Sequence, residues 1–218
     1  MRVADRDRDT VRATIQLLDY RRRVAAVYAG LRERGVDEAG WRWWRQQRDE
    51  LFAAHPMSPI PPQQRAGFRG LDYFAHDPAF HLGPVPLTPV EPVTFEIGHS
   101  ATGGTPARRF ATLEFELLGQ RCSLPVYWLD VYGGGVFVPF RDATSGTTTY
   151  GGGRYLFDTV KSADLGGDDA HLLVDFNFAY HPSCVHDPAW SCPLAPADER
   201  LPVAIEAGER LRVADPLA

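Results

Sequence analysis

The feature that most constrains the fold is a change in the spacing of apolar residues along the chain. Near the N-terminus they recur every three or four residues, whereas from Val93 onward they alternate with polar residues. The first spacing is typical of a helix with one buried face, and alternation is typical of a strand with one buried face. A proline-rich segment, residues 57–64, separates the two patterns. The sequence therefore predicts a helical N-terminus followed by a β domain.

Two helices are predicted in the N-terminal part. The first follows an apolar stripe that begins at Val11, and Gly35 stands where a left-handed residue commonly ends a helix. Asp37 can cap the second helix. That helix is expected to end at His55-Pro56, because a residue before proline avoids helical geometry.

These patterns divide the chain into three regions. Residues 1–55 are expected to form a helical arm that packs on the sheet, residues 56–92 an irregular proline-rich connector, and residues 93–218 an antiparallel β domain. The 20 glycines and 18 prolines suit many turns between short strands. We expect a mainly β fold of the α+β type, with about seven to nine strands in an antiparallel barrel or sandwich. The last hairpin is placed within residues 201–213.

Composition and charge argue against several classes of partner. A net charge of −5 is mild and disfavours nucleic acid. No apolar run is long enough to cross a membrane, and the charged N-terminus has no signal core. Three cysteines are too few for a secreted scaffold built on disulfides. We therefore expect a cytoplasmic protein that binds neither nucleic acid nor a membrane.

Charged and amide side chains stand on or beside the predicted strands, where a purely structural sheet would not need them. If the loop around Ser145-Gly146 is a hairpin connection of two or four residues, Arg141, Tyr150 and Arg154 share one side of the sheet. Guanidinium groups bind planar anions with two parallel hydrogen bonds. The pattern thus predicts a pocket for an anionic small molecule.

The strand predicted from Val174 to Tyr180 contributes a second polar face, formed by Asp175, Asn177 and His181. A wet sheet edge, or a structural ion pair such as Arg154 with Asp175, would produce the same pattern. On the pocket hypothesis, Asp175 is the acid/base group together with His181. The predicted ligand-binding residues are Arg141, Asp142, Tyr150, Arg154 and Asn177.

Cysteines and histidines cluster between residues 181 and 192, and four interpretations stay open. The side chains of His181, Cys184, His186 and Cys192 are of the type that binds zinc, although their spacing is not that of a standard zinc finger. Cys184 and Cys192 could instead form a disulfide, which a cytoplasmic setting disfavours. Cys184 could be a nucleophile with His181 or His186 as its base. Finally, both cysteines could be small apolar fillers.

Three segments of the chain resemble an uncharacterised bacterial and archaeal family catalogued as domain of unknown function 1684. They read PFRDATSGTTTYGGGRYL, DFNFAYHPSC and CPLAPADERLPVAIEAGE. The resemblance covers roughly residues 40–212 and implies that the polar set is a family feature, but it supplies no reaction. This chain carries His181 and His186 where the family commonly has Asn and an aromatic residue.

The leading hypothesis is a small-molecule binding protein, or an enzyme of unknown reaction, with a site for an anionic metabolite. No cofactor is evident from the sequence. The first alternative is a non-catalytic interaction module that docks a partner or a second copy through the tryptophan-rich arm, with its Trp41, Trp43, Trp44, Arg45 and Arg48. The second alternative is a zinc-dependent protein that uses the cysteine and histidine cluster.

Overall fold

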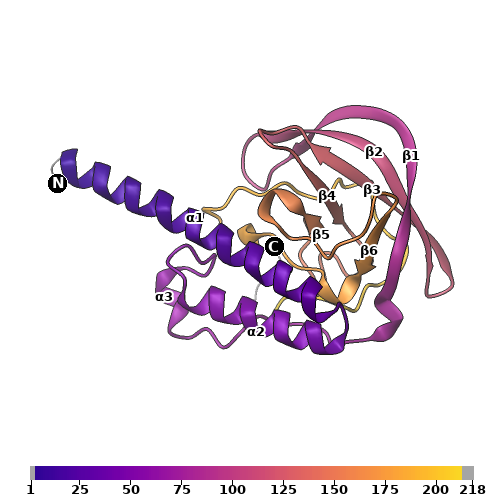
Figure 1. Cartoon of the computed structure of the whole chain (residues 1–218), viewed down its shortest axis with the longest axis horizontal. Coiled ribbons are helices and arrows are strands. Elements are labelled where there is room, and N and C mark those ends of the chain that lie inside the picture. Colours follow the sequence, from indigo (N-terminus) through magenta and orange to yellow (C-terminus); the bar gives the residue numbers. More distant parts are fainter. Residues whose placement is uncertain (1–2, 213–218) are drawn as a thin grey trace.

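The computed structural model describes residues 3–212 and shows helices followed by one antiparallel sheet (Figure 1). The helices are α1 (Val3–Arg34), α2 (Glu38–Ala54) and α3 (Pro62–Arg65), and short 3-10 turns lie at Pro78–Phe80, Thr159–Lys161, Phe176–Phe178 and Ser183–Val185. The strands are β1 (His81–Gly98), β2 (Gly104–Leu117), β3 (Gln120–Leu129), β4 (Gly135–Phe140), β5 (Arg154–Asp158) and β6 (His171–Asp175). The predicted mainly β architecture with N-terminal helices is confirmed.

The predicted ends of the first two helices are also confirmed. Gly35 has φ 108° and donates its N–H to the carbonyl of Leu31, which ends α1. The Asp37 carboxylate accepts a hydrogen bond of 2.8 Å from the N–H of Gly40 at the start of α2. His55 is extended and ends α2 one residue before proline.

The sheet has the strand order β5-β4-β3-β2-β1-β6 and curls into a half-barrel (Figure 1). The long strand β1 makes the curl possible because it pairs with β6 through residues 81–86 and with β2 through residues 87–98. An irregularity between Pro89 and Val93 bends the strand within its pairing with β2. β1 begins at His81, so the irregular connector ends at Phe80 and not at residue 92 as predicted.

Within residues 3–212 the sheet has six strands, fewer than the seven to nine predicted. One predicted strand is shorter than expected and the predicted C-terminal hairpin does not form. The strand predicted from Val174 to Tyr180 ends at Asp175, the last residue of β6. The Asp175 carboxylate accepts the N–H of Asn177 and starts a 3-10 turn there. The expected hairpin in residues 201–213 is replaced, as far as Arg212, by an irregular segment that hydrogen-bonds to side chains and loops.

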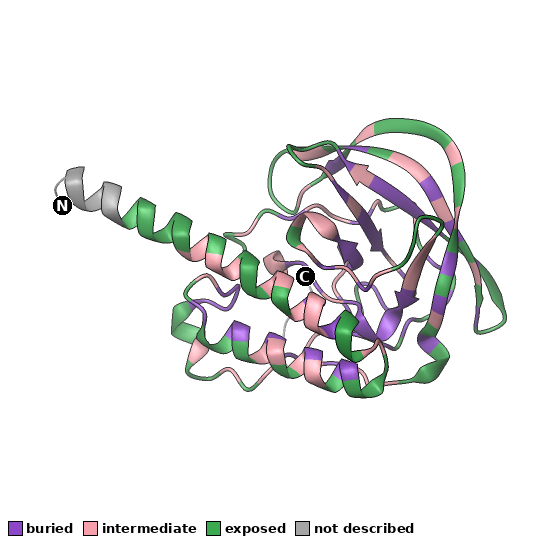
Figure 2. Cartoon of the chain, viewed as in Figure 1, coloured by how far each residue is buried: buried purple, intermediate pink, exposed green. Residues whose placement is uncertain are grey.

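The core lies between the inner face of the half-barrel and α2 (Figure 2). Trp44 of α2 is fully buried, and its ring packs edge-on against Phe178 at a centroid distance of 5.2 Å. Among the described side chains of α1, Tyr28 and Leu31 belong to this core. The first part of α1 projects from the body (Figure 1), and within it residues 9–15 are exposed (Figure 2). No helix within residues 3–212 combines the length and the apolar character needed to cross a membrane.

Candidate functional site

Arg154 and Asp142 form a buried ion pair. Their charged atoms are 2.6 Å apart, and the two side chains are 1% and 0% exposed. Arg154 also donates to the backbone carbonyls of Ile205, at 2.8 Å, and Ala207. These two predicted ligand-binding residues therefore neutralise each other and fasten the C-terminal segment to β5.

The predicted hairpin register does not hold around Arg154. Thirteen residues, 141–153, separate β4 from β5, in place of a two- or four-residue connection. Asp142 organises this loop, because its carboxylate accepts the N–H and the hydroxyl of Thr144. Arg141 points elsewhere and donates to the carbonyl of Ala195 at 2.9 Å.

Asp175 and Asn177 form a separate buried cluster. The Asp175 carboxylate lies 2.8 Å from Nδ1 of His81 and accepts the side-chain amide of Asn177 at 2.8 Å. The Asn177 side chain also exchanges two hydrogen bonds with the backbone of Asp77. This cluster joins the connector to the end of β6.

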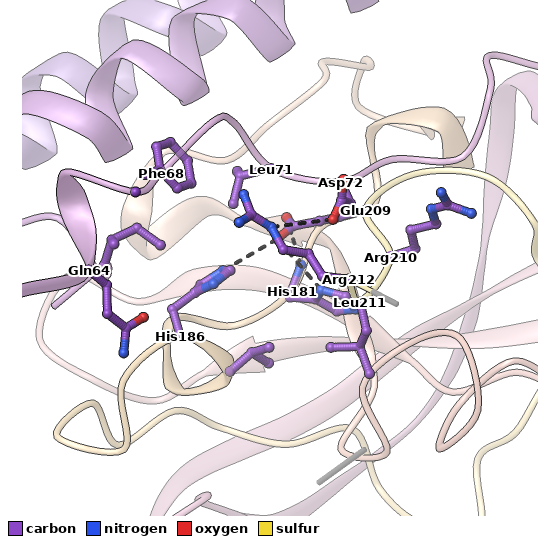
Figure 3. A pocket seen from close by; sticks show the side chains of 13 residues that line it. Gln64, Phe68, Leu71, Asp72, His181, His186, Glu209, Arg210, Leu211 and Arg212 are labelled. Atoms are coloured by element: carbon purple, nitrogen blue, oxygen red, sulfur yellow. Dashed lines mark hydrogen bonds and ion pairs between the residues drawn. The ribbon is translucent and has the colours of Figure 1, made fainter. Parts of the chain in front are cut away.

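The structure instead brings buried charges together at Glu209, which is 1% exposed. Its Oε2 accepts 2.7 Å from Arg48 of α2 and 3.2 Å from the backbone N–H of His181. Its Oε1 lies 3.5 Å from Nδ1 of His181 and 3.4 Å from Nε2 of His186. Figure 3 shows both rings directed toward this carboxylate.

Local backbone geometry sets the position of Glu209. Gly208 has φ 76°, and a Cβ there would lie 2.6 Å from the carbonyl oxygen of Ala179. A glycine is therefore required at this turn. Glu209 itself donates its N–H to Ala179 at 2.8 Å and pairs with Tyr73 in an isolated β-bridge.

The electrostatics of the cluster fix two protonation states. Burial raises the pKa of Glu209, but Arg48 and the two histidines together hold that pKa well below 4.5. Burial lowers the pKa of His181, which Glu209 opposes and Arg154 and His186 reinforce. Because Nε2 of His181 accepts the N–H of Tyr150 at 3.2 Å, the neutral ring carries its proton on Nδ1, toward Glu209.

A cavity of about 260 Å³ opens beside this cluster. Its polar lining includes Gln64, Asp72, His181, His186, Glu209, Arg210 and Arg212. Arg212 lies 3.3 Å from Asp72, and the Arg210 guanidinium stacks over Phe74. The cavity thus lies between the connector, the loop after β6 and the C-terminal segment, and α2 reaches the cluster only through the bond of Arg48 to Glu209.

Cys184 and Cys192 are both free thiols, of which Cys184 is partly exposed and Cys192 is buried. The neighbours Cys192, Ser100 and Tyr150 lower the pKa of the Cys184 thiol to about 6. His181 faces Glu209, so the four residues of the zinc alternative do not converge. In the part of the chain that the structure describes, no group of three or more His, Cys, Asp or Glu residues could hold a metal ion.

Comparison with known proteins identifies the relatives of this chain. Residues 66–210 match the family model described as Protein of unknown function (DUF1684). The chain belongs to this family. It is also similar to an uncharacterised protein of Haloarcula marismortui whose structure was solved by NMR in solution. The two sequences are 34% identical, the similarity covers 82% of this chain and 96% of that chain, and the TM-score is 0.56. No curated protein matches.

The family match includes Glu209 and both histidines but not Arg48, which precedes residue 66. Of the residues in the Glu209 cluster, His181 was expected at a site as an acid/base group. His186 was expected as an alternative ligand or base, and Arg48 as part of an interface. Glu209 was not singled out, and the resemblance over the AIEAGE stretch was the sequence signal closest to it.

Arg154→Ala is expected to lower the free energy of unfolding by about 3–5 kcal/mol, because Asp142 would remain buried without its partner. Urea denaturation measures this cost. Arg108→Ala is the matched control, since the Arg108–Asp130 pair at 3.1 Å is exposed and should contribute less than about 1 kcal/mol. Equal costs for the two variants would contradict a dry, charged Arg154–Asp142 pair.

Unfolding experiments against pH should show a contribution from His181. The unfolded chain binds a proton near pH 6.5, whereas the folded chain takes it up only at lower pH. The stability that comes from neutral His181 is therefore complete above pH 6.5 and is lost as the pH falls toward its folded pKa. His181→Asn should flatten this decline, and His171→Asn, at an exposed histidine, should not. The same slope in His181→Asn and the wild type would contradict the assignment.

Proposed function

We propose that this protein binds a small anionic molecule in the cavity beside Glu209. The observation that carries the proposal is the Glu209 carboxylate, which is buried yet charged and lies at the wall of the cavity. The ring of His186 contacts it from the cavity side. Burial of a charged group costs free energy that other contacts have to offset. Buried groups with shifted pKa values are therefore found more often at functional sites than elsewhere. The ligand site is thus moved from the Arg141–Arg154 region, where Arg154 and Asp142 neutralise each other.

The lining of the cavity suggests the chemistry of the ligand. Arg210 and Arg212 bring two positive charges to it and Asp72 one negative charge, while Arg48 balances Glu209. An anionic group suits this excess of positive charge. Oε1 of Glu209 is itself buried, and the donors nearest to it are His181 and His186, at 3.5 and 3.4 Å, so the ligand is placed against the partly exposed ring of His186 and not on the carboxylate. Small hydroxy acids, amino acids and phosphates carry the anionic group that this lining suits.

His186 is the side chain to which we assign acid/base work on such a ligand. With Nε2 directed at Glu209, a neutral His186 ring keeps its proton there and leaves Nδ1 as an acceptor. A charged carboxylate stabilises the imidazolium that forms when Nδ1 takes a proton. Asp175 is not assigned this role, because His81 and Asn177 occupy its oxygens.

We infer a cytoplasmic setting from the composition of the sequence.

Calorimetric titration with a panel of small hydroxy acids, amino acids and phosphates is expected to find ligands that bind the wild type. His186→Gln should weaken them at least about tenfold, because it removes the ring held on Glu209. His171→Gln is the control, since His171 also pairs with a carboxylate, that of Asp168, but lies outside the cavity. Binding that His186→Gln leaves intact, or a panel without any binder, would contradict the proposal.

A second candidate function is self-association through α1. Val11, Ile15 and Leu18 are 63%, 57% and 42% exposed, and their spacing puts them on one face of the projecting part of the helix. Trp41 and Trp44 are buried in the core and Trp43 is half-buried, so the most exposed apolar residues of the helical arm lie on α1 and not on the tryptophans.

A second copy of the chain is the partner that we propose for this face. In an antiparallel pair of α1 helices centred on Ile15, Val11 and Leu18 lie on either side of the centre, four and three residues away, so the two apolar stripes meet face to face. Such a twofold contact uses the same patch on both copies and would bury the exposed stripe.

Light scattering on the eluting protein should report a dimer for the wild type. Ile15→Glu should give a monomer, because it places a charge at the centre of the apolar stripe. Val131→Glu, an equally drastic change at an exposed apolar residue in the turn after β3, should leave the dimer intact. A monomeric wild type would rule out this second candidate.

A further inference from the structure

A second cavity, of about 140 Å³, lies between α1 and the sheet. Its walls are formed by α1, α2, β5 and the segments that follow β5 and β6. His181 is the one residue that lines both this cavity and the cavity beside Glu209. The second cavity is therefore a separate space, and the proposed function makes no use of it.

α1 is fixed over this space by its C-terminal part. Tyr28 and Leu31 are buried in the core. Arg32 donates a hydrogen bond of 2.6 Å to the carbonyl of Asp164, in the segment after β5. The space beneath the preceding turns of α1 thus belongs to the packed fold and does not depend on a loosely placed helix.

Aromatic rings make up much of the lining. They belong to Tyr20, Tyr28, Phe52, Tyr155, Tyr180 and Trp190. The rings of Tyr155 and Tyr180 pack edge to face with their centroids 5.6 Å apart, and such rings accept a further ring through the same kind of contact. A cavity of about 150 Å³ holds one benzene molecule, so the volume suits a ligand with a single aromatic ring.

Two tyrosine hydroxyls in the lining are available to a ligand. Tyr20 and Tyr180 are both partly exposed, and neither hydroxyl forms a hydrogen bond with the described residues, 3–212. Burial raises the pKa of Tyr20 to about 12 and the pKa of Tyr180 well above its usual value. Both hydroxyls therefore keep their protons at neutral pH and can donate to an acceptor on the ligand.

The charge of the lining is positive. It contains Arg21, Arg48 and Lys161 and, among the described residues, neither Asp nor Glu. Glu209 balances Arg48. Asp158 lies 3.4 Å from Nζ of Lys161. Arg21 is exposed and forms no ion pair with the part of the chain that the structure describes, so it can pair with an anionic group at the mouth of the cavity.

We propose that this second cavity binds a small aromatic carboxylate. The ring of the ligand lies among the aromatic side chains, and its carboxylate faces Arg21 at the mouth. The hydroxyls of Tyr20 and Tyr180 donate to the polar groups of the ligand. This site does not rest on the cavity beside Glu209, and either site can fail without the other.

NMR and calorimetric titrations of the folded, full-length chain with benzoate test the site. The indole N–H signals of the five tryptophans are assigned with single Trp→Phe variants. Benzoate should shift the signal of Trp190, which lines the cavity, and not that of Trp128 in β3. Acetate, which has the charge without the ring, should shift neither. Equal shifts of both tryptophans, or no saturable shift with benzoate, would overturn the proposal.

Two pairs of variants locate the ring and the carboxylate. Val24→Phe fills the cavity from α1 and should weaken benzoate at least about tenfold. Val27→Phe, at a half-buried valine in the groove between α1 and α2, should leave its affinity unchanged. Arg21→Gln should weaken benzoate about two- to fivefold, the range of an exposed ion pair, and should not affect the uncharged benzyl alcohol. Arg22→Gln, at the next exposed arginine and outside the lining, is its control.

His186→Gln separates this site from the cavity beside Glu209. Benzoate should bind this variant as tightly as the wild type, because His186 lines the other cavity alone. Benzoate that loses affinity in His186→Gln and keeps it in Val24→Phe would lie beside Glu209, and the second site would be refuted.

Discussion

Two buried arginines hold the C-terminal segment in place, and the rest of the structure depends on them. Within residues 201–212 the segment forms no strand, so its polar backbone groups need other partners in the core. Arg154 donates hydrogen bonds to the carbonyls of Ile205 and Ala207, and Arg48 donates one to the Glu209 carboxylate. Each guanidinium is itself compensated by a carboxylate, as burial of a charge requires.

This arrangement explains why the fold and the candidate site meet at Glu209. Arg48 reaches Glu209 from α2, where its guanidinium also stacks over Trp44 and donates 2.9 Å to the Tyr73 hydroxyl. The helix, the connector and the C-terminal segment are therefore fastened by the carboxylate that lies on the cavity wall. A change at Glu209 would disturb folding and binding together, whereas His186 contacts the same carboxylate from a more exposed position.

The sequence predicted those elements whose signals are local. Asp37, Gly35 and the His55-Pro56 step determine the ends of helices through their own backbone neighbours, and the alternation in β1 to β3 reflects one buried face. The family assignment also came from local motifs and is confirmed by the match over residues 66–210.

Prediction failed where side chains hydrogen-bond to the backbone nearby or to partners far along the chain. Asp142 and Asp175 lie in alternating patterns, yet each carboxylate accepts a backbone N–H two residues on and turns the chain. The alternating pattern continues past these residues in the sequence, whereas β4 ends at Phe140 and β6 ends at Asp175. Arg48 and Glu209 are 161 residues apart, and no spacing rule links them. The candidate cavity could therefore be found only once the chain was folded.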